Sequence, residues 1–382
     1  MTGAPRILAA SRILIDATAG ARPDCSGIGR YVHELLRAIA AEPSAPDVEI
    51  GVRGSKWRDR GCLPLAAFGP PPTLRRLADW RDRFGLRGID LVHGLDVRLP
   101  PNRRVACVAT LHDLFSLERD DLADDRFRRK RAHQYQRLAD DADRIVCVSA
   151  ATEAAFLARF PQARGRTAVI HHGVDPRFVR PDAAELAAFR ARHALPQRYL
   201  LFVGLLSTRK NLLMLLEAFR AVAAHDRDLA LVLAGQQSHG FAPIAEAIER
   251  HPDRARIVRP GFVADAELPA LYAAATCFAF PSLLEGFGLP ILEAFACGTP
   301  VVASTLPVFA EIGGELLRTA PGDDPAAFAA ALEAALAQRD DGALAARRIT
   351  HARRFTWQRA MRSTIAVWQA ALAERTGRAS AG

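Results

Sequence analysis

The chain contains two series of short runs rich in valine, isoleucine and leucine, and these runs restrict its fold more than any other feature. Most of them are continuously apolar rather than alternating, which is typical of parallel strands covered by helices on both faces of a sheet. The first series comprises residues 12–18, 47–53, 89–94, 104–110, 144–149 and 167–173, and the second comprises 199–204, 229–235, 255–261, 275–280 and 299–304. We therefore expect an α/β protein with parallel sheets.

Amphipathic helical patterns separate these runs, for example over 29–41, 149–160, 211–225 and 289–298. Two such series in one chain predict two doubly wound, Rossmann-like domains. The boundary is expected within 175–198, where prolines flank a polar helical pattern. We predict an N-terminal domain over 1–178 and a C-terminal domain over 179–354.

The charge balance is basic, with 51 Lys and Arg residues against 42 Asp and Glu residues in 382. Such a balance favours an anionic partner, whether nucleotide phosphates, an acidic membrane surface or nucleic acid. Aromatic residues make up only 7% of the chain. This argues against a nucleic-acid binder, because such proteins cluster basic and aromatic residues.

The cysteines and the N-terminus both indicate a cytoplasmic protein. The six cysteines form no C-x-x-C pair, and several lie in apolar runs, which favours reduced thiols over disulfides or a zinc site. Arg6, Arg12 and Asp16 interrupt the first twenty residues, so these make a poor signal peptide. No run approaches the roughly 18 apolar residues that cross a bilayer. We expect any membrane contact to be peripheral.

Residues 281–304, PSLLEGFGLPILEAFACGTPVVAS, carry two glutamates, Glu285 and Glu293, in uncharged surroundings. The stretch predicts a strand, a loop, a helix and a further strand, with Pro290 at the first helical position and Gly298 ending the helix. In a parallel sheet this helix N-terminus points out of the carboxyl end of the strands, where ligands bind, and its free N–H groups favour an anion.

Two carboxylates at such a position suit a sugar nucleotide. A carboxylate accepts hydrogen bonds from the vicinal hydroxyls of a ribose or hexose. The N–H groups around Phe287 and Gly288 suit phosphate oxygens. Glu293 alone is also explained as an ordinary partner of the helix dipole, but the whole set predicts a nucleotide-sugar pocket.

The stretch resembles the donor-site signature of the family 4 retaining glycosyltransferases of the GT-B fold, in which seven residues separate the two glutamates. Segments elsewhere resemble further motifs of that family in the same order: RILIDATAGARPDCSGIGRYVHELL (12–36), TLHDLFSL (110–117), IHHGVD (170–175) and FVGLLSTRKNL (202–212). The resemblance implies a donor/acceptor cleft between two Rossmann-like domains. It also implies that a C-terminal helix, 355–378, packs back on the N-terminal domain.

The resemblance also implies roles for the residues of the signature. Glu293 is expected to accept hydrogen bonds from the donor ribose. Glu285 is expected to hold hydroxyls of the transferred sugar. The main chain at Phe287, Gly288 and Leu289 is expected to complete the phosphate and sugar contacts.

Arg209 and Lys210 are expected to clamp the diphosphate. Their chemistry fits this role independently, since two cations after a strand end neutralise the charge that develops on a leaving group. Lys210 is one of only three lysines, which favours a functional role over a solvated loop position. Many relatives carry an arginine after the glycine of the strand end, but here Gly204, assigned to the donor site, precedes Leu205. We expect Arg209 to supply that charge.

In the N-terminal half, Gly27 and Gly29 are expected to let the backbone approach the donor diphosphate or the acceptor closely. A dinucleotide-binding fingerprint would need a third small residue where Val32 stands and an acidic residue at the end of the next strand, which is absent. A nicotinamide enzyme is therefore disfavoured.

His112 follows the predicted strand 104–110, so it is expected at the strand's carboxyl end, facing the cleft. By resemblance it would hydrogen-bond the transferred sugar, with Asp113 fixing the ring or the loop. Ser149 and Thr152 are interpreted as capping residues of the next helix, a structural role.

The resemblance implies that the anomeric configuration is retained by front-face displacement, in which the departing phosphate oxygen takes the proton of the incoming hydroxyl. Positioning and charge stabilisation then suffice, and we expect neither a metal nor another cofactor. The triplet DAD at 141–143 resembles the metal motif of another glycosyltransferase fold. We interpret it as a solvated helix end.

The motifs GIGRY, LHDL and TRKN resemble those of the bacterial branch of the family that builds surface polysaccharides. This resemblance favours GDP-mannose as donor and leaves UDP- and dTDP-sugars open. The expected acceptor is a glycan or a lipid-linked glycan of bacterial surface polysaccharide. The basic run RFRRKR (126–131) fits either a solvated helix face or a contact with anionic lipid at the inner face of the cell membrane. The alternatives are a non-catalytic GT-B scaffold and a GT-B epimerase acting on UDP-GlcNAc.

Overall fold

The computed structural model describes residues 11–22, 27–77, 86–100, 105–119 and 124–380, with side chains to residue 375. Arg6 and Cys25, used above, lie outside the described residues. The described chain forms two compact units. Unit 1 comprises the residues up to Gly173 and those from Thr356 onward, and unit 2 comprises Val174–Phe355. The chain thus passes between the units twice, and the sequence predicts these two boundaries at 178/179 and 354/355.

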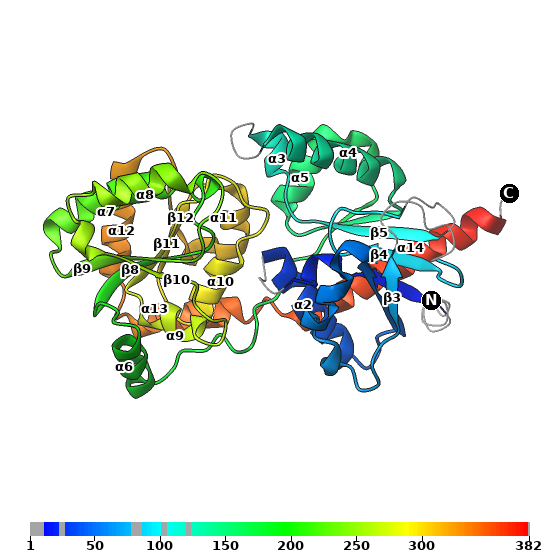
Figure 1. Ribbon diagram of the computed structural model, residues 1–382, viewed down its shortest axis with the longest axis horizontal. Helices are drawn as coiled ribbons and strands as arrows, with labels where there is room; N and C mark the ends of the chain where they lie inside the picture. Colours follow the sequence, from blue (N-terminus) through cyan, green and yellow to red (C-terminus); the bar gives the residue numbers. More distant parts are fainter. Residues whose placement is uncertain (1–10, 23–26, 78–85, 101–104, 120–123, 381–382) are drawn as a thin grey trace. The chain divides into compact units, whose positions relative to one another are not determined.

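Unit 1 is built on one parallel sheet (Figure 1). Its strand order is β3-β2-β1-β4-β5-β6-β7. Its strands are β1 (Ile13–Asp16), β2 (Val48–Arg53), β3 (Leu74–Leu77), β4 (Leu91–Gly94), β5 (Ala106–Leu111), β6 (Arg144–Cys147) and β7 (Thr167–Val169). Its helices include α2 (Gly27–Ala41), α3 (Phe115–Glu118), α4 (Asp125–Asp141), α5 (Ala150–Arg159) and α14 (Trp357–Ser380). Ser149 caps α5 by accepting from the Thr152 N–H at 3.0 Å, which confirms the predicted structural role.

Unit 2 repeats the plan with a parallel sheet in the order β10-β9-β8-β11-β12-β13. Its strands are β8 (Arg198–Val203), β9 (Leu229–Ala234), β10 (Ile257–Gly261), β11 (Cys277–Phe280), β12 (Val301–Ser304) and β13 (Arg318–Ala320). This is the strand order of a doubly wound sheet. The prediction of two doubly wound α/β domains is confirmed.

Helices cover both faces of the second sheet (Figure 1). On one face lie α7 (Leu212–His225), α8 (Phe241–Glu249) and α12 (Pro325–Leu336); on the other lie α6 (Ala183–Arg192), α9 (Leu268–Ala274), α10 (Leu289–Ala296) and α13 (Gly342–Ala352). Helix α11 (Pro307–Gly313) packs beside α10. With both faces covered, the central strands β8, β9, β11 and β12 are buried almost throughout, which explains their continuous apolar sequences.

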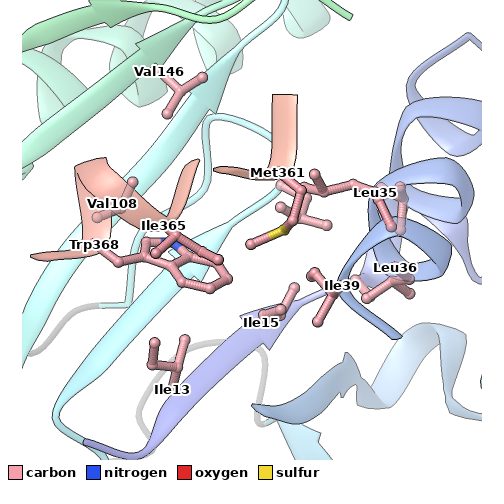
Figure 2. Close-up of a cluster of buried hydrophobic side chains, with 14 of the residues drawn as sticks. Ile13, Ile15, Leu35, Leu36, Ile39, Val108, Val146, Met361, Ile365 and Trp368 are labelled. Carbon is pink, nitrogen blue, oxygen red and sulfur yellow. The ribbon is translucent and has the colours of Figure 1, made fainter. Parts of the chain in front are cut away.

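The C-terminal helix α14 belongs to the core of unit 1. It packs against α2 and against β4, β5 and β6. Met361, Ile365 and Trp368 of α14 join Ile13 and Ile15 of β1 in one buried cluster (Figure 2). The Trp368 indole N–H donates to Nδ1 of the buried His93 at 3.0 Å. The apolar side chains of α14 therefore face the core of unit 1 and complete the cover of its sheet.

The DAD triplet departs from the expected solvated helix end. Asp141 is the last residue of α4 and pairs with Arg137 at 3.3 Å. Asp143, however, is buried: its carboxylate accepts from the Cys107 N–H at 2.8 Å and from Arg375 of α14 at 3.3 Å. The prediction was wrong for Asp143, because Arg375 of α14, 232 residues later in the chain, supplies its counter-ion.

No helix among the described residues is long and apolar enough to span a membrane.

Candidate active site

The carboxyl edge of the second sheet brings together the two predicted cations and one predicted carboxylate. β8 ends at Val203 and continues into Gly204, whose φ of +147° favours glycine. A turn of 3-10 helix then contains Arg209 and Lys210. Asn211, which has the left-handed conformation, leads into α7. The two consecutive cations therefore lie in the segment that follows the carboxyl end of β8.

Glu285 of the loop after β11 lies between those cations. Arg209 Nη1 is 3.1 Å from Glu285 Oε1 and also donates to the Leu284 carbonyl at 2.8 Å. The Lys210 ammonium forms a hydrogen bond and ion pair with the same carboxylate oxygen. Its Nζ also lies 4.7 Å from the ring centroid of Phe280. Since the Lys210 side chain is 9% exposed and that of Glu285 12%, solvent screens this pair weakly.

Glu285 is ionised at neutral pH. Burial by itself raises the pKa of its carboxyl group, but Arg209 and Lys210 lower it more, so the pKa falls from 4.5 to about 2. The Arg209–Lys210–Glu285 cluster therefore carries one net positive charge at neutral pH, where two cations alone would carry two.

The second carboxylate, Glu293, lies on α10 and is buried with 2% exposure. Its Oε2 accepts a hydrogen bond from the Tyr272 hydroxyl at 2.9 Å. Tyr272, on α9, is a residue that sequence reasoning missed, because it lies in an apolar helical pattern that reads as core. The hydrogen bond fixes the orientation of the Glu293 carboxylate.

The loop between the two glutamates is set by packing. Gly288 has a φ of +112°, and a Cβ there would lie 3.0 Å from both Ile312 and Phe309. Phe287 is buried and meets Phe355 edge-on at 6.4 Å. Helix α10 begins at Leu289, so Pro290 occupies the second helical position rather than the predicted first. The ordered loop leads directly into the N-terminus of α10.

In unit 1, His112 follows β5 as predicted and is buried. Its Nε2 lies 2.9 Å from the Leu95 carbonyl. Because a carbonyl only accepts, Nε2 carries the hydrogen, and in the neutral ring Nδ1 carries the lone pair. Burial lowers the pKa of His112 and outweighs the Leu95 hydrogen bond and the Asp96 charge, both of which raise it. Asp113 accepts from Tyr135 through its main-chain oxygen at 3.0 Å.

An aromatic stack surrounds His112, and sequence reasoning missed it. Tyr31 of α2 meets His112 edge-on at 4.8 Å and stacks on His172 at 4.8 Å. His172 in turn stacks on Trp357 at 5.6 Å. His172 lies in the IHHGVD motif, but nothing in that motif indicates a partner at residue 31 or 357.

Gly27 and Gly29 lie in the first turn of α2, whose described part starts two residues before the helical pattern expected over 29–41. Tyr31, Leu35 and Ile39 of α2 are buried at helical spacing, so this face of the helix belongs to the core. A Cβ at Gly27 would meet no atom within 4 Å, so packing of the described chain does not require glycine there. Val32 is fully buried, as suits a core position.

The structure thus divides the predicted site residues into two sets. Unit 2 holds Gly204, the Arg209–Lys210–Glu285 cluster, and the loop–helix residues Phe287, Gly288, Leu289 and Glu293. Unit 1 holds His112, Gly27 and Gly29. The predicted cleft between the domains stays a prediction. Within the described ranges, no three His, Cys, Asp or Glu side chains gather in a way that could hold a metal ion.

Comparison with known proteins places the chain in a family. Residues 25–178 match the model described as Glycosyltransferase Family 4, and residues 197–338 match that described as Glycosyl transferases group 1. Together these ranges cover more than half of the chain. The chain belongs to the family 4 glycosyltransferases. Both matched regions contain predicted site residues, His112 in the first and Glu285 in the second.

The curated relatives of this glycosyltransferase include O-antigen chain mannosyltransferase B of Escherichia coli, 29% identical over 92% of this chain and 98% of that protein. A D-inositol 3-phosphate glycosyltransferase of Salinispora tropica is 33% identical, over 64% of this chain and 54% of that protein. The serotype-specific mannosyltransferase WbdA of Escherichia coli is 30% identical over 61% of this chain, which covers 30% of WbdA.

Solved structures share the fold. Sucrose-phosphate synthase from Thermosynechococcus elongatus aligns with a TM-score of 0.68 and 22% identity, over 97% of this chain and 100% of that one. WaaG, a glycosyltransferase involved in lipopolysaccharide biosynthesis, aligns with a TM-score of 0.65 and 16% identity, over 94% and 98%. These likenesses show the fold, which is GT-B as predicted.

The two units of this glycosyltransferase are expected to lose stability in different pH ranges. Burial lowers the pKa of His93 to about 3 and also lowers the pKa values of His112 and His172, so the unfolded state of unit 1 takes up protons that the folded state does not. Stability of unit 1 therefore falls as pH drops below about 6.5, by up to about 1.4 kcal/mol per pH unit for each histidine. In unit 2 the lowered pKa of Glu285 stabilises the fold above about 4.5, and that contribution is lost as pH falls towards about 2.

Hydrogen exchange followed peptide by peptide between pH 7 and pH 5 measures this difference. As the pH falls, we expect the free energy of opening of unit 1 to decrease. In His172→Phe, which keeps the ring stack, the slope of that free energy against pH should be smaller by the contribution of one histidine. Equal slopes in the wild type and the variant would contradict this explanation.

Proposed function

We propose that the chain is a retaining hexosyltransferase that moves mannose from GDP-mannose to a glycan or lipid-linked glycan, without a metal or other cofactor. The observation that supports it most is the Arg209–Lys210–Glu285 cluster, which stands at the carboxyl edge of a parallel sheet. The 29% identity to an O-antigen chain mannosyltransferase, over nearly the full length of both chains, favours mannose and a bacterial surface polysaccharide.

In the proposed reaction the bond between the anomeric carbon and the diphosphate oxygen breaks, and a bond to the acceptor oxygen forms on the same face of the sugar. The acceptor's proton passes to the departing phosphate oxygen. Arg209 and Lys210 neutralise the charge that develops on the diphosphate, and the N-terminus of α10 adds free N–H groups. The chain's remaining task is to orient the donor and the acceptor.

The other site residues would orient the donor. Glu293, held by Tyr272, would accept hydrogen bonds from the ribose, while the main chain at Phe287, Gly288 and Leu289 would contact phosphate and sugar. The Nδ1 lone pair of His112, whose Nε2 hydrogen is engaged by Leu95, would accept a hydrogen bond from a sugar hydroxyl.

Calorimetric titration in EDTA with GDP, UDP and dTDP in turn tests the donor. We expect GDP to bind most tightly, and transfer from GDP-mannose to proceed in EDTA with retention at the anomeric carbon. Preferential UDP binding would move the proposal to a UDP-sugar, an alternative favoured by the structural similarity to Anabaena HepE in complex with UDP (TM-score 0.69, 17% identity, over 93% of this chain and 98% of that one). If no nucleotide bound and no sugar nucleotide were consumed, the alternative of a non-catalytic GT-B scaffold would replace this proposal.

Tyr272→Phe is expected to weaken nucleotide binding about tenfold or more, because it removes a hydrogen bond to a buried carboxylate. Binding of inorganic pyrophosphate should not change, since pyrophosphate has no ribose for Glu293 to hold. Tyr199→Phe is the matched control: Tyr199 is also fully buried in unit 2, but its hydroxyl donates to the Leu271 carbonyl at 2.8 Å. Equal losses in both variants, or an equal loss for pyrophosphate, would indicate a purely structural role for Tyr272.

The proposal includes a peripheral contact with anionic lipid at the inner, cytoplasmic face of the cell membrane. Of the basic run on α4, Arg126, Arg129 and Lys130 are exposed. Arg131 instead pairs with the partly buried Asp96 at 3.1 Å, and Arg128 pairs with Asp125 at 3.2 Å. Only part of the run is thus available to a membrane.

Flotation with vesicles of phosphatidylglycerol and phosphatidylcholine tests this contact. We expect binding that the triple Arg126→Gln, Arg129→Gln, Lys130→Gln variant loses. The triple Arg192→Gln, Arg220→Gln, Arg250→Gln variant removes the same charge from exposed positions of unit 2 and should still float. No flotation of the wild type would remove the membrane contact from the proposal.

A further inference from the structure

The position of Glu285 raises a question that its expected contact with sugar hydroxyls does not answer. Its carboxylate oxygen already takes a hydrogen bond from Lys210 and lies 3.1 Å from Arg209. Phosphate oxygens would bind the same N–H groups, because both are anionic acceptors. Glu285 therefore competes for the cations that are proposed to hold the diphosphate.

From this geometry we infer that Glu285 is an internal counter-ion of the diphosphate clamp, and that it speeds release of the nucleoside diphosphate after transfer. The inference rests on the proposed function and deepens it. Before the donor binds, the carboxylate keeps two cations, one of them buried, paired and in position. Once the sugar has left, the same carboxylate takes the cations back from the product.

The charges of donor and product explain why release would be favoured over donor loss. A nucleotide sugar is a diphosphate diester with two negative charges. The nucleoside diphosphate left after transfer has a terminal phosphate whose second ionisation lies near pH 6, so it carries about three charges at neutral pH. A fixed negative charge at Glu285 repels the product more strongly than the donor. Because the side chains of Lys210 and Glu285 are only 9% and 12% exposed, solvent screens this difference weakly.

A carboxylate that served only to hold sugar hydroxyls, or only to anchor Lys210, would behave differently. In the first case its neutralisation would leave the affinity for a sugar-free diphosphate unchanged. In the second, Lys210 would lose its position and diphosphate affinity would fall. The counter-ion role alone predicts that removal of the negative charge tightens diphosphate binding.

Calorimetry on the full chain with inorganic pyrophosphate, GDP, UDP and dTDP separates these cases. We expect Glu285→Gln to bind pyrophosphate and the preferred nucleoside diphosphate about tenfold more tightly or better, and to tighten binding of the matching nucleotide sugar less. Turnover should fall, with product release slowed. Glu246→Gln is the matched control, since it removes one negative charge from an exposed position on α8 of the same unit and should change none of these affinities.

Thermal unfolding keeps the test valid where the variant is less stable. Glu285→Gln and Glu285→Ala leave Lys210 without its anionic partner, so both should melt below the wild type without ligand, and pyrophosphate should raise their melting temperatures more than it raises that of the wild type. Unchanged or weaker diphosphate binding by both variants would overturn the inference while the proposed function stood. Failure of the wild type and every variant to bind any diphosphate would overturn both.

Discussion

Lys210→Ala is expected to lower kcat/KM for sugar transfer about 10²- to 10³-fold, the usual cost of removing one preorganised group that stabilises transition-state charge. Lys210 is buried beside Glu285 and over the ring of Phe280, so solvent screens its charge weakly. Its loss also leaves Glu285 paired with Arg209 alone, so the net charge of the cluster changes from positive to neutral. Initial-rate kinetics with varied nucleotide sugar measure the effect.

The chain supplies matched controls, because it has only two other lysines. Lys56 pairs with Asp59 at 3.3 Å and Lys130 is exposed on α4, both in unit 1. Lys56→Ala and Lys130→Ala should leave kcat/KM for a soluble acceptor within about twofold, since exposed charges contribute little. A Lys210→Ala enzyme that melts like the wild type and transfers sugar at the same rate would rule out the clamp.

The sheets could be predicted from the sequence wherever burial forces a continuous apolar run. This held for the central strands, such as β9 with all six residues buried. It failed for β3 (Leu74–Leu77), whose LRRL sequence is half exposed at a sheet edge, and for β13 (Arg318–Ala320), an edge strand of three residues. At these two edges the strand has one neighbour and less cover, so the hydrophobic effect leaves no comparable pattern there.

The site could be predicted as residue types but not as contacts. Glu285, Arg209 and Lys210 stood out because charges are rare at the ends of apolar strands. That Lys210 lies against Glu285, 75 positions away, depends on the order of β8 beside β11, which periodicity does not encode. Tyr272, which holds Glu293, was missed because it lies in an apolar helical pattern that is typical of core residues.

Folding of unit 1 depends on a helix from the far end of the chain, and Trp368→Ala is expected to lower its stability by about 3 to 5 kcal/mol. Trp368 is fully buried on α14 among Ile13 and Ile15 of β1 (Figure 2), and its indole N–H is bonded to His93. Alanine would leave a cavity and remove the donor to Nδ1 of the buried His93, whose Nε2 keeps its hydrogen bond with Thr110. Because a domain is stable by only about 5 to 15 kcal/mol, urea unfolding followed by circular dichroism should show a separate, earlier transition.

Two further variants divide this loss into its causes. Trp368→Phe fills most of the cavity but leaves Nδ1 of His93 without its donor, so about 1 to 3 kcal/mol should be lost. Arg362→Ala, on the same helix, removes an exposed side chain that pairs with Glu42 and should cost no more than about 0.5 kcal/mol. If Trp368→Ala unfolded at the wild-type urea concentration, α14 would not be part of the cooperative core of unit 1. If only peptides of unit 1 gained hydrogen exchange, the two crossings of the chain at 173/174 and 355/356 would be shown to separate two units that fold independently.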